Sequence, residues 1–382
     1  MYLKDLFMTE IYLIRHAQAE GNIYRFMQGH WDGDVTETGQ LQIKALAEKL
    51  KDIKIDAVYS SDLKRAFMTA QAALKYHPEI RINTDKRIRE INLGPWEGVP
   101  FGNLYYHHKE EMTLFLSDSP YWHIEGAETF EQVTHRAYEA LCEIAKRHEG
   151  QSTVIVSHGV TLRCLQSKMV GVTIDQAKDL PISKNTGISH YYFQNGVFTP
   201  DYIGDSSHLN ALEGELKKEP LAFGGVFFRF EAEDPAQMEA YYKSCYEDSW
   251  YFAHRNTEHF KADTYFRSAI LHYRKDKGSI IKIYEGDEEA GLLDLDPERG
   301  RKEDCGWISL LYLKEEYRGR GLGIQALGQA VMHFRKLGRT KLRLFAAESN
   351  APALSFYRKH GFKEVGFETA ADGNILLMER EI

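Results

Sequence analysis

Short apolar runs alternate with helical patterns along the first half of the chain. Residues 11–14, 57–59 and 153–157 are rich in β-branched and aromatic side chains, a composition typical of buried strands. Residues 41–50 instead repeat leucine and alanine at helical spacing, and a second helical stretch follows residue 62. This alternation predicts an α/β domain.

The second half of the chain carries a different order of elements. No internal repeat relates it to the first half, so we expect a second fold. Strands are predicted at residues 226–231, 279–284, 289–295, 306–313 and 341–345, and helices at 235–251, 262–274, 323–337 and around 356–357.

A polar segment separates the two halves. A strand at 189–193 and the hairpin-like turn Gln194-Asn195-Gly196 close the first domain. The stretch 200–220 is charged and polar, as linkers are, with one short helix predicted at 209–216. We therefore predict a first domain at 1–205, a linker at 206–222 and a second domain at 223–382.

Composition limits the possible classes of function. The 382 residues carry a net charge of −8, and this balance indicates no basic face for nucleic acid. The four cysteines lie far apart without ligand spacing, which indicates free thiols and no metal site. No leader and no stretch of about 18 uninterrupted apolar residues is recognisable, so we expect a cytoplasmic protein without a membrane partner.

The first apolar run ends abruptly at Arg15-His16. Ligands of open α/β sheets bind beyond the carboxyl ends of strands, where helix starts leave backbone N–H groups free. An arginine there offers a planar fork for phosphate oxygens, and the adjacent imidazole offers a nucleophile. The dipeptide alone is equally compatible with a solvated loop. It predicts a phosphate site only if other residues complete one.

Three further stretches place polar side chains at strand ends or turns. A helix carrying Arg65 begins where the second apolar run ends, so the arginine lies near a positive helix end. Glu90 precedes a turn and is either a surface ion-pair residue or, beside a phosphate, a proton donor to a leaving alkoxide. The third run ends at His158, the second histidine at the end of a predicted strand.

Five motifs of the first half occur in the order in which the histidine phosphatase superfamily carries them. They read LIRHAQAEGN, VTETGQLQ, YSSDLKRAFMTA, REINLGPWEG and VSHGVTLR. The first half therefore resembles this superfamily, which includes phosphoglycerate mutases and small broad-specificity phosphatases. The resemblance implies a phosphoglycerate mutase-like three-layer α/β/α domain.

The resemblance also implies roles for individual residues. His16 would accept the phosphoryl group, and Glu90 would act as general acid and base. No metal is required, because a neutral imidazole is a competent nucleophile near pH 7. The phosphate oxygens would be held by Arg15, Asn22, Arg65 and His158.

Some positions of the phosphate loop are ambiguous or depart from the superfamily. Asn22 and Gln28 either contact phosphate or substrate or cap the loop. Ala17 stands where glycine is more frequent, and Ala19 stands where a hydroxyl residue is usual. We expect the missing hydroxyl at position 19 to weaken one hydrogen bond to phosphate.

The segment 98–151 corresponds to the part that shapes substrate choice in the superfamily. It is short for a mutase, whose members carry longer basic insertions, so the resemblance favours a phosphatase for a small phosphorylated metabolite. Mutase activity stays an alternative, because the reactions differ in whether water or a second hydroxyl takes the phosphoryl group. The aromatic residues that either line a pocket or form the core of a helical cap are Tyr105, Tyr106, Phe115, Tyr121 and Trp122.

A glycine-rich turn, RGRGLG at 318–323, links a predicted strand to a helix in the second half. Such a turn exposes successive N–H groups that can hold a pyrophosphate, although alone it also fits a surface turn. A strand, Asn350-Ala351-Pro352 and a helix with Phe356 and Tyr357 follow. This succession resembles the GNAT acetyltransferase superfamily. The resemblance implies a GNAT-fold mixed α/β domain that uses acetyl-CoA and an amine acceptor.

The GNAT resemblance assigns candidate residues. Tyr357 would protonate the departing thiolate, or it is a packed aromatic residue. Asn350 would help to place the cofactor, or it caps the following helix. The general base stays open among Glu258, His259, Glu285 and Asp294. The cofactor contacts would be Tyr312, Leu313, Arg318, Gly319, Arg320, Gly321, Leu322, Gly323 and Asn350.

The two resemblances together predict a bifunctional enzyme. One site would hydrolyse a phosphomonoester through a phosphohistidine intermediate, and the other would acetylate an amine. The alternative is a phosphoglycerate mutase-like phosphoryl transferase whose GNAT domain only binds acyl-CoA as a regulatory module. The sequence names neither substrate and does not predict an oligomeric state.

Overall fold

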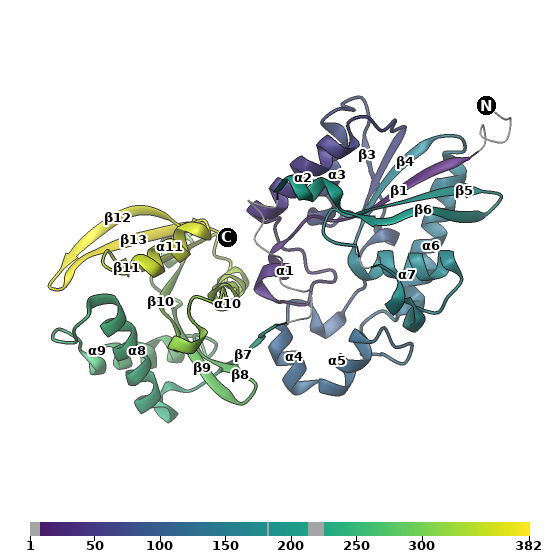
Figure 1. Cartoon of the computed structure of the whole chain (residues 1–382). Coiled ribbons are helices and arrows are strands. Elements are labelled where there is room, and N and C mark those ends of the chain that lie inside the picture. Colours follow the sequence, from purple (N-terminus) through teal and green to yellow (C-terminus); the bar gives the residue numbers. More distant parts are fainter. Residues whose placement is uncertain (1–7, 182, 213–224) are drawn as a thin grey trace. The chain divides into compact units, whose positions relative to one another are not determined.

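The structure is a computed structural model that describes residues 8–181, 183–212 and 225–382 (Figure 1). The chain divides into two units. The first takes in Met1–Val99 and His107–Gly225, and the second takes in Pro100–Tyr106 and Val226–Ile382. Among the described residues, no helix has the length and apolar character that crossing a membrane requires.

A six-stranded sheet runs through the described part of the first unit in the order β3-β2-β4-β1-β5-β6. The first four strands are parallel, β5 pairs antiparallel with β1, and β6 pairs antiparallel with β5. The strands are β1 (Thr9–Arg15), β2 (Ala57–Ser60), β3 (Ile82–Thr84), β4 (Ser152–Ser157), β5 (Ile188–Gln194) and β6 (Val197–Asp205). The helices are α1 (Glu20–Tyr24), α2 (Glu37–Leu50), α3 (Lys64–Leu74), α5 (Lys109–Leu116), α6 (Phe130–Arg147) and α7 (Gly159–Val170).

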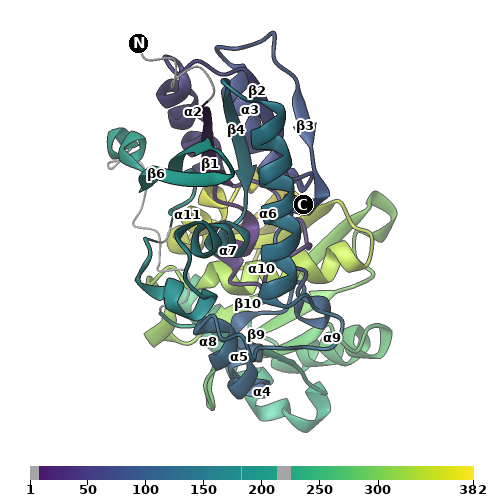
Figure 2. The same ribbon diagram turned by 90° about the vertical axis from the view of Figure 1, so that its right-hand side faces the viewer.

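Helices cover both faces of this sheet. Successive residues of a strand point to opposite faces, and Leu13 accordingly joins a core with Leu141 of α6, whereas Ile14 joins one with Leu46 of α2. Figure 2 shows α6 along one face of the sheet. The predicted three-layer α/β/α architecture is confirmed.

The register of β1 and β4 aligns the ends of the two strands. Arg15 is paired with Ser157, so the next residue of each strand leaves the sheet at the same edge. These next residues are His16 and His158. The two histidines predicted at strand ends are therefore brought together by parallel pairing.

The close of the first unit differs from its prediction in one respect. The turn at Asn195 and Gly196 is a hairpin, with φ of 53° and 83°, as predicted. Strand β6, however, continues to Asp205 through a stretch that we expected to be irregular. The predicted short helix at 209–216 is a 3-10 helix, Ser207–Leu212, as far as residue 212, and the remainder of it lies outside the described residues. The domain boundaries and the linker stay predictions.

A mixed seven-stranded sheet forms the described part of the second unit, in the order β12-β13-β11-β10-β9-β8-β7. The strands are β7 (Phe228–Ala232), β8 (Ile280–Glu285), β9 (Glu288–Asp296), β10 (Cys305–Leu313), β11 (Lys341–Ala347), β12 (Lys363–Ala370) and β13 (Gly373–Glu381). The helices are α8 (Glu239–His254), α9 (Ala262–Lys275), α10 (Gly323–Lys336) and α11 (Ala351–Lys359).

Two layers of helix pack on this second sheet. Tyr242 of α8 and Ala269 of α9 share a core with Leu292 and Leu310. Phe334 of α10 lies so close to Gly306 that a Cβ there would be 2.2 Å from its ring. The predicted GNAT-type arrangement of sheet and helices is confirmed.

Residues 100–106, which lie mostly in the short helix α4 (Phe101–His107), belong to the second unit. The Asn103 amide donates to the Phe230 carbonyl at 2.9 Å and accepts from the Phe230 N–H at 3.0 Å. Tyr105 stacks on Phe227, with ring centroids 5.3 Å apart. Tyr105 therefore packs in the second unit, and it does not join the aromatic residues of the first.

The remaining aromatic residues of the segment 98–151 divide between core and surface. Phe115 and Trp122 are buried and pack on Trp96 and Phe130. Tyr121 is 84% exposed. Phe115 and Trp122 thus form the core of a helical cap, which was one of the two predicted alternatives.

Candidate active site

His16, the predicted nucleophile, lies directly after β1. Its side chain is buried, and Nδ1 lies 2.7 Å from the Ala17 carbonyl oxygen. Because a carbonyl only accepts, Nδ1 carries the proton and Nε2 keeps its lone pair. Burial lowers the pKa of His16, and the charges of Arg65 and Arg15 lower it further. The imidazole is therefore neutral at neutral pH, with Nε2 as the reactive atom.

His158 forms a second wall of the same site. Its ring lies 5.2 Å from the His16 ring, centroid to centroid. Both of its nitrogens are buried and, among the described residues, have no hydrogen-bond partner. Burial, followed by the charge of Arg65, lowers its pKa. Buried polar groups without partners are rare in proteins, and those of His158 mark a place where a polar ligand would be stabilised.

Arg65 lies in the first turn of α3 with its side chain fully buried. It donates to the Gly29 carbonyl at 2.7 Å and to the Trp31 carbonyl at 3.0 Å, and it also contacts Asp32. Its Nε–H is buried without a hydrogen-bond partner among the described residues. Arg65 thus holds the loop 28–32 and retains one N–H for a ligand.

Arg15 is held between a loop and a helix start. One of its terminal nitrogens donates to the Ser183 carbonyl at 2.9 Å. Its guanidinium lies against Gly159, the first residue of α7, where a Cβ would be 3.5 Å from Nε. The cationic side chain therefore lies in van der Waals range of the start of α7, and an anion at this place would meet both the guanidinium and the positive end of the helix.

Glu90 is buried at the same helix start. One carboxylate oxygen accepts the Thr161 N–H at 3.0 Å, and the other accepts the Val160 N–H at 3.2 Å. The partial positive charge of a helix N-terminus favours a carboxylate there. The exposed surface ion pair that we weighed for Glu90 is therefore wrong. Its carboxyl group is a fixed part of the interior beside His158, the N-cap of α7.

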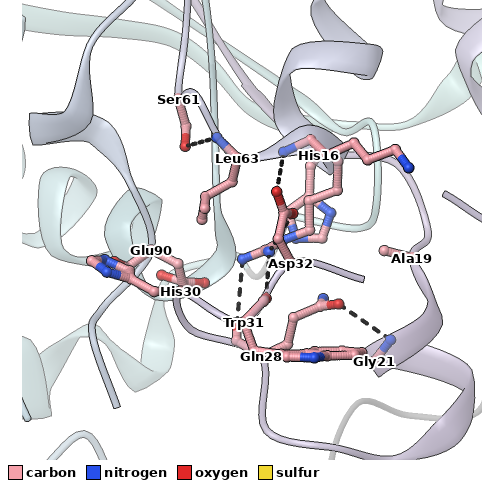
Figure 3. Close-up of polar contacts among 12 residues, drawn as sticks. His16, Ala19, Gly21, Gln28, His30, Trp31, Asp32, Ser61, Leu63 and Glu90 are labelled. Carbon is pink, nitrogen blue, oxygen red and sulfur yellow. Dashed lines mark hydrogen bonds and ion pairs between the residues drawn. The ribbon is translucent and has the colours of Figure 1, made fainter. Parts of the chain in front are cut away.

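Asn22 and Gln28 cap the loop that follows the nucleophile. The Asn22 side-chain oxygen accepts the Ala19 N–H at 2.9 Å, and that of Gln28 accepts the Gly21 N–H at 3.2 Å (Figure 3). Ala19 itself is buried. These contacts correspond to the capping alternative, and the contact of Asn22 with phosphate stays a prediction.

Several residues that fix the backbone at His16 were not predicted. The Asn185 amide donates to the His16 carbonyl at 2.7 Å, and the Thr186 N–H donates to the Arg15 carbonyl at 3.0 Å. The hydroxyl of Thr69 accepts the Ala17 N–H at 2.9 Å. Thr186 has a φ of 59°, which is unusual for a residue other than glycine. The sequence Asn185-Thr186-Gly187 signals a turn, but it does not indicate what the turn contacts.

The second unit opens between β10 and β11. The two strands pair only from Cys305–Ile308 against 341–344, although both continue further. The pairing of β10 with β9 shifts its register at the same place, between Ile308 and Leu310. Tyr312 and Leu313, both buried, lie on the part of β10 that has separated from β11. The separation exposes strand edges beside the predicted cofactor residues.

The glycine-rich turn lies just beyond the end of β10. Gly319 and Gly321 have φ of 70° and 76°, and a Cβ at either would meet no atom within 4 Å. The backbone therefore needs glycine for its conformation and faces open space. Arg318 points back, since it donates to the Leu313 carbonyl at 2.6 Å and pairs with Asp248. The turn thus offers mainly backbone N–H groups, as a pyrophosphate site would.

Tyr357 and Asn350 both lie at α11. Tyr357 is buried between Phe356 and Phe362, and burial raises the pKa of its phenol, so it stays protonated at neutral pH. This is the form that can donate a proton to a thiolate. The Asn350 side chain accepts the Ala353 N–H at 3.2 Å, so it is the N-cap of α11. A contact of Asn350 with the cofactor stays a prediction.

The four candidates for a general base differ in their surroundings. Asp294 is buried and accepts from the Tyr242 hydroxyl at 2.5 Å and from His272 Nδ1 at 2.7 Å. Both of its oxygens are thus engaged, which argues against proton abstraction from an amine. His259 is exposed and contacts Asp372 at 2.9 Å, and Glu258 is also exposed. Glu285 is half-buried at the end of β8.

Within the described ranges, no group of three or more histidine, cysteine, aspartate or glutamate side chains is arranged to hold a metal ion.

Two regions of the chain match known families. Residues 11–206 match the histidine phosphatase superfamily (branch 1), and residues 236–362 match the acetyltransferase (GNAT) family. The two matches agree with the order of the units and with both predicted resemblances.

Similar proteins cover the first half of the chain. The phosphoglycerate mutase-like protein 4 of Arabidopsis thaliana is 32% identical over 54% of this chain and 89% of its own length. The putative phosphoserine phosphatase 2 of Hydrogenobacter thermophilus is 29% identical over 54% of this chain and its whole length. The solved structure of YhfR from Bacillus stearothermophilus is 32% identical, with a TM-score of 0.51, over 53% of this chain and 99% of its own.

The buried neutral histidines predict that acid destabilises the first unit. The pKa of His16 and of His158 is lowered by folding, so below about pH 6.5 the unfolded chain binds more protons than the folded chain. The stability they contribute is complete above that pH and is lost as the pH falls. In His158→Asn, the free energy of unfolding should decline less steeply than in the wild type, by up to ~1.4 kcal/mol per pH unit below about pH 6.

Urea titrations at about pH 7, 6 and 5 measure this difference in slope. His135 on α6 is exposed, so His135→Asn should keep the wild-type slope. Equal slopes for wild type and His158→Asn would contradict a lowered pKa for His158.

Proposed function

Because this chain belongs to the histidine phosphatase superfamily (branch 1), we propose that its first unit hydrolyses a small phosphomonoester through a phosphohistidine at His16. The observation that supports this most directly is the pair of buried histidines at the ends of β1 and β4, with their rings 5.2 Å apart. The tautomer of His16 leaves Nε2 free to attack, and three cationic or polar side chains surround the place where the phosphoryl group would lie.

The reaction would proceed in two displacements. In the first, the His16 Nε2 lone pair forms the N–P bond while the P–O bond to the leaving group breaks, and Glu90 gives its proton to the leaving oxygen. In the second, water attacks phosphorus, Glu90 takes the proton of that water, and the N–P bond breaks to release phosphate. Arg15, Arg65 and His158 would stabilise the equatorial oxygens in both steps.

The names of relatives suggest which substrates to test first. Two relatives in Hydrogenobacter thermophilus and one in Arabidopsis thaliana are named phosphoserine phosphatases, and others are named phosphoglycerate mutases. O-Phospho-L-serine and 3-phosphoglycerate are therefore the first candidates. Conversion between phosphoglycerate isomers faster than phosphate release would establish the mutase alternative.

The second unit is a GNAT family domain, and we propose that it transfers the acetyl group of acetyl-CoA to an amine. The open glycine turn at 318–323 would hold the pyrophosphate, and the separated β10 edge at Tyr312 and Leu313 would hold the cofactor arm. The amine nitrogen would attack the thioester carbonyl, and Tyr357 would protonate the departing thiolate sulfur. The alternative, an acyl-CoA-binding regulatory module, predicts binding without turnover on any amine.

Replacement of the nucleophile should abolish phosphatase activity. His16→Ala removes the atom that accepts the phosphoryl group, so hydrolysis of p-nitrophenyl phosphate should fall by at least about a thousandfold. The exposed His135→Ala serves as the matched control and should retain wild-type turnover. Substantial activity in His16→Ala would refute the phosphohistidine route. In that case, mass spectrometry of wild type quenched in alkali, where the acid-labile P–N bond survives, should find no phosphate on His16.

Chelation of metals should leave the phosphatase active. The proposed chemistry uses imidazole, guanidinium and carboxyl groups, so prolonged treatment with EDTA should change the rate of p-nitrophenyl phosphate hydrolysis by less than about twofold. A loss that added Mg²⁺, Mn²⁺ or Zn²⁺ restores would contradict the metal-independent mechanism. The parallel measurement on EDTA-treated His16→Ala gives the background rate.

Blocking the glycine turn should remove the cofactor. Gly321→Glu places a carboxylate and a strained φ where the pyrophosphate would lie, so acetyl-CoA affinity measured by calorimetry should fall by at least about a hundredfold. Gly338, just beyond the other end of α10, has a similar φ of 71° and equally open surroundings. Gly338→Glu therefore controls for backbone strain and should bind normally. Equal effects of the two variants would argue against a pyrophosphate site at the glycine-rich turn 318–323.

A further inference from the structure

We propose that Arg136 of α6 is a positioning residue that sets the place of the Glu90 carboxyl group, an inference that rests on the proposed function of Glu90. The side chain of Arg136 is largely buried and reaches the backbone of the segment 87–90. It does not touch the Glu90 carboxylate through any hydrogen bond in the described part of the chain. It acts on the backbone from which that carboxylate extends.

Every N–H of the Arg136 guanidinium has an acceptor. One terminal nitrogen donates to the carbonyls of Arg87 at 2.7 Å and Arg89 at 2.9 Å. The other donates to the carbonyl of Glu90 at 2.9 Å and to a Glu128 carboxylate oxygen at 2.8 Å. Nε donates to the second Glu128 oxygen at 2.7 Å. These contacts use all the donors that an arginine has, and a lysine with its fewer donors cannot reproduce them.

The segment depends on these bonds because it is not part of the sheet. Residues 86–88 form one 3-10 turn, and Arg89 is extended without a strand partner among the described residues. The carbonyls of the segment 87–90 therefore accept from side chains, because buried carbonyl groups need hydrogen-bond donors. His30 Nε2 lies 3.0 Å from the same Glu90 carbonyl that Arg136 contacts (Figure 3).

Glu128 holds the Arg136 side chain and also bonds to the backbone on the other side of Glu90. Besides the two bonds to Arg136, its carboxylate accepts the Asn92 N–H at 2.8 Å, and its own N–H donates to the Asn92 carbonyl at 2.8 Å. Thr129 then begins α6 as a capping box with Gln132, which fixes the helix phase that turns Arg136 toward the segment. Both sides of Glu90 are thus tied to the start of α6.

The Glu90 carboxylate has little freedom once its backbone is fixed. It lies against the Val160 and Thr161 N–H groups at the start of α7, and the Thr161 hydroxyl is 3.1 Å from it. A backbone shift of about 1 Å would break these bonds and move the proton donor away from the leaving oxygen. Loss of Arg136 should therefore impair proton transfer before it impairs attack by His16.

The leaving group distinguishes this role from a purely structural one. Nitrophenolate departs as a stable anion, whereas an alkoxide needs a proton from Glu90. In Arg136→Ala and Arg136→Lys, rapid-quench kinetics with p-nitrophenyl phosphate should still show a burst of nearly one nitrophenolate per site. Steady-state turnover should fall about a hundredfold, because water attack on the phosphohistidine also needs Glu90, and phosphohistidine should accumulate.

An alkyl phosphate should show the complementary behaviour. With whichever of O-phospho-L-serine, 3-phosphoglycerate and glycerol 3-phosphate the wild type turns over best, the first step should slow at least about tenfold more than with p-nitrophenyl phosphate. The control is Arg147→Lys in the last turn of the same helix, whose guanidinium contacts the Tyr59 hydroxyl and should leave both substrates unaffected.

Three outcomes decide the proposal. Wild-type kinetics in both Arg136 variants would overturn it, as would a burst amplitude that falls in proportion to turnover, because that shows a loss of folded sites. If Arg136→Ala does not fold, Arg136→Lys, which keeps the charge, decides by the same criteria. Hydrolysis of p-nitrophenyl phosphate by His16→Ala at close to the wild-type rate would instead refute the proposed function itself, independently of Arg136.

Discussion

The parallel pairing of β1 with β4 is the constraint on which the proposed phosphatase site depends. The register that pairs Arg15 with Ser157 releases His16 and His158 at one edge of the sheet. A slip of one residue would turn each side chain to the opposite face, because side chains along a strand alternate. The apolar residues of both strands are buried in cores on both faces, and this burial keeps the register. The chemistry at the sheet edge is therefore fixed by packing several residues away.

The proposed phosphate sites of the two units differ in the groups that would bind the ligand. In the first unit, buried side chains are left with unsatisfied or partly satisfied polar atoms, so the pocket gains most from an anion that supplies acceptors. Its helix start at α7 is already occupied by the Glu90 carboxylate. In the second unit, the turn before α10 faces open space and offers its backbone. A charged pocket suits a compact phosphoryl group in reaction, and an open backbone turn suits a cofactor that must leave after each turnover.

The strands that end at His16 and His158 and the glycine-rich turn at 318–323 could be predicted, because each appears as a pattern of neighbouring residues in the sequence. An apolar run that stops at Arg15-His16 is visible without any knowledge of its neighbours. The part of β6 from residue 200 onward was expected to resemble a linker, because its polar and exposed residues carry little alternation. The grouping of residues 100–106 with the second unit was not predicted, since the hydrogen bonds of Asn103 to Phe230 join positions that are far apart in sequence. Contacts between residues that are far apart in the sequence produce no periodic pattern in either segment.

The supporting residues of the site escaped prediction for a related reason. Asn185, Thr186 and Arg136 donate hydrogen bonds to carbonyl groups of other segments. Whether a donor reaches such a carbonyl depends on how close the fold brings the two segments, and neither local sequence shows that distance. Asn22 illustrates the opposite difficulty, since its position matched a phosphate contact but its oxygen caps a loop. Residue type and motif position therefore point to the proposed reacting groups, but they do not indicate which residues hold the backbone of those groups.

The guanidinium of Arg136 reads only oxygen atoms of the main chain and one carboxylate. Bonds to main-chain carbonyls do not depend on which side chains those residues carry. Substitutions of residues 87 and 89 would therefore change their present ion pairs with Asp85 and Asp62, but they would leave the contacts of Arg136 with the main chain in place. On the proposed role of Arg136, a change at this one position of α6 would remove all of these contacts at once. Surface side chains near the proposed site can therefore change, and substrate preference with them, while the Glu90 carboxyl group keeps its position.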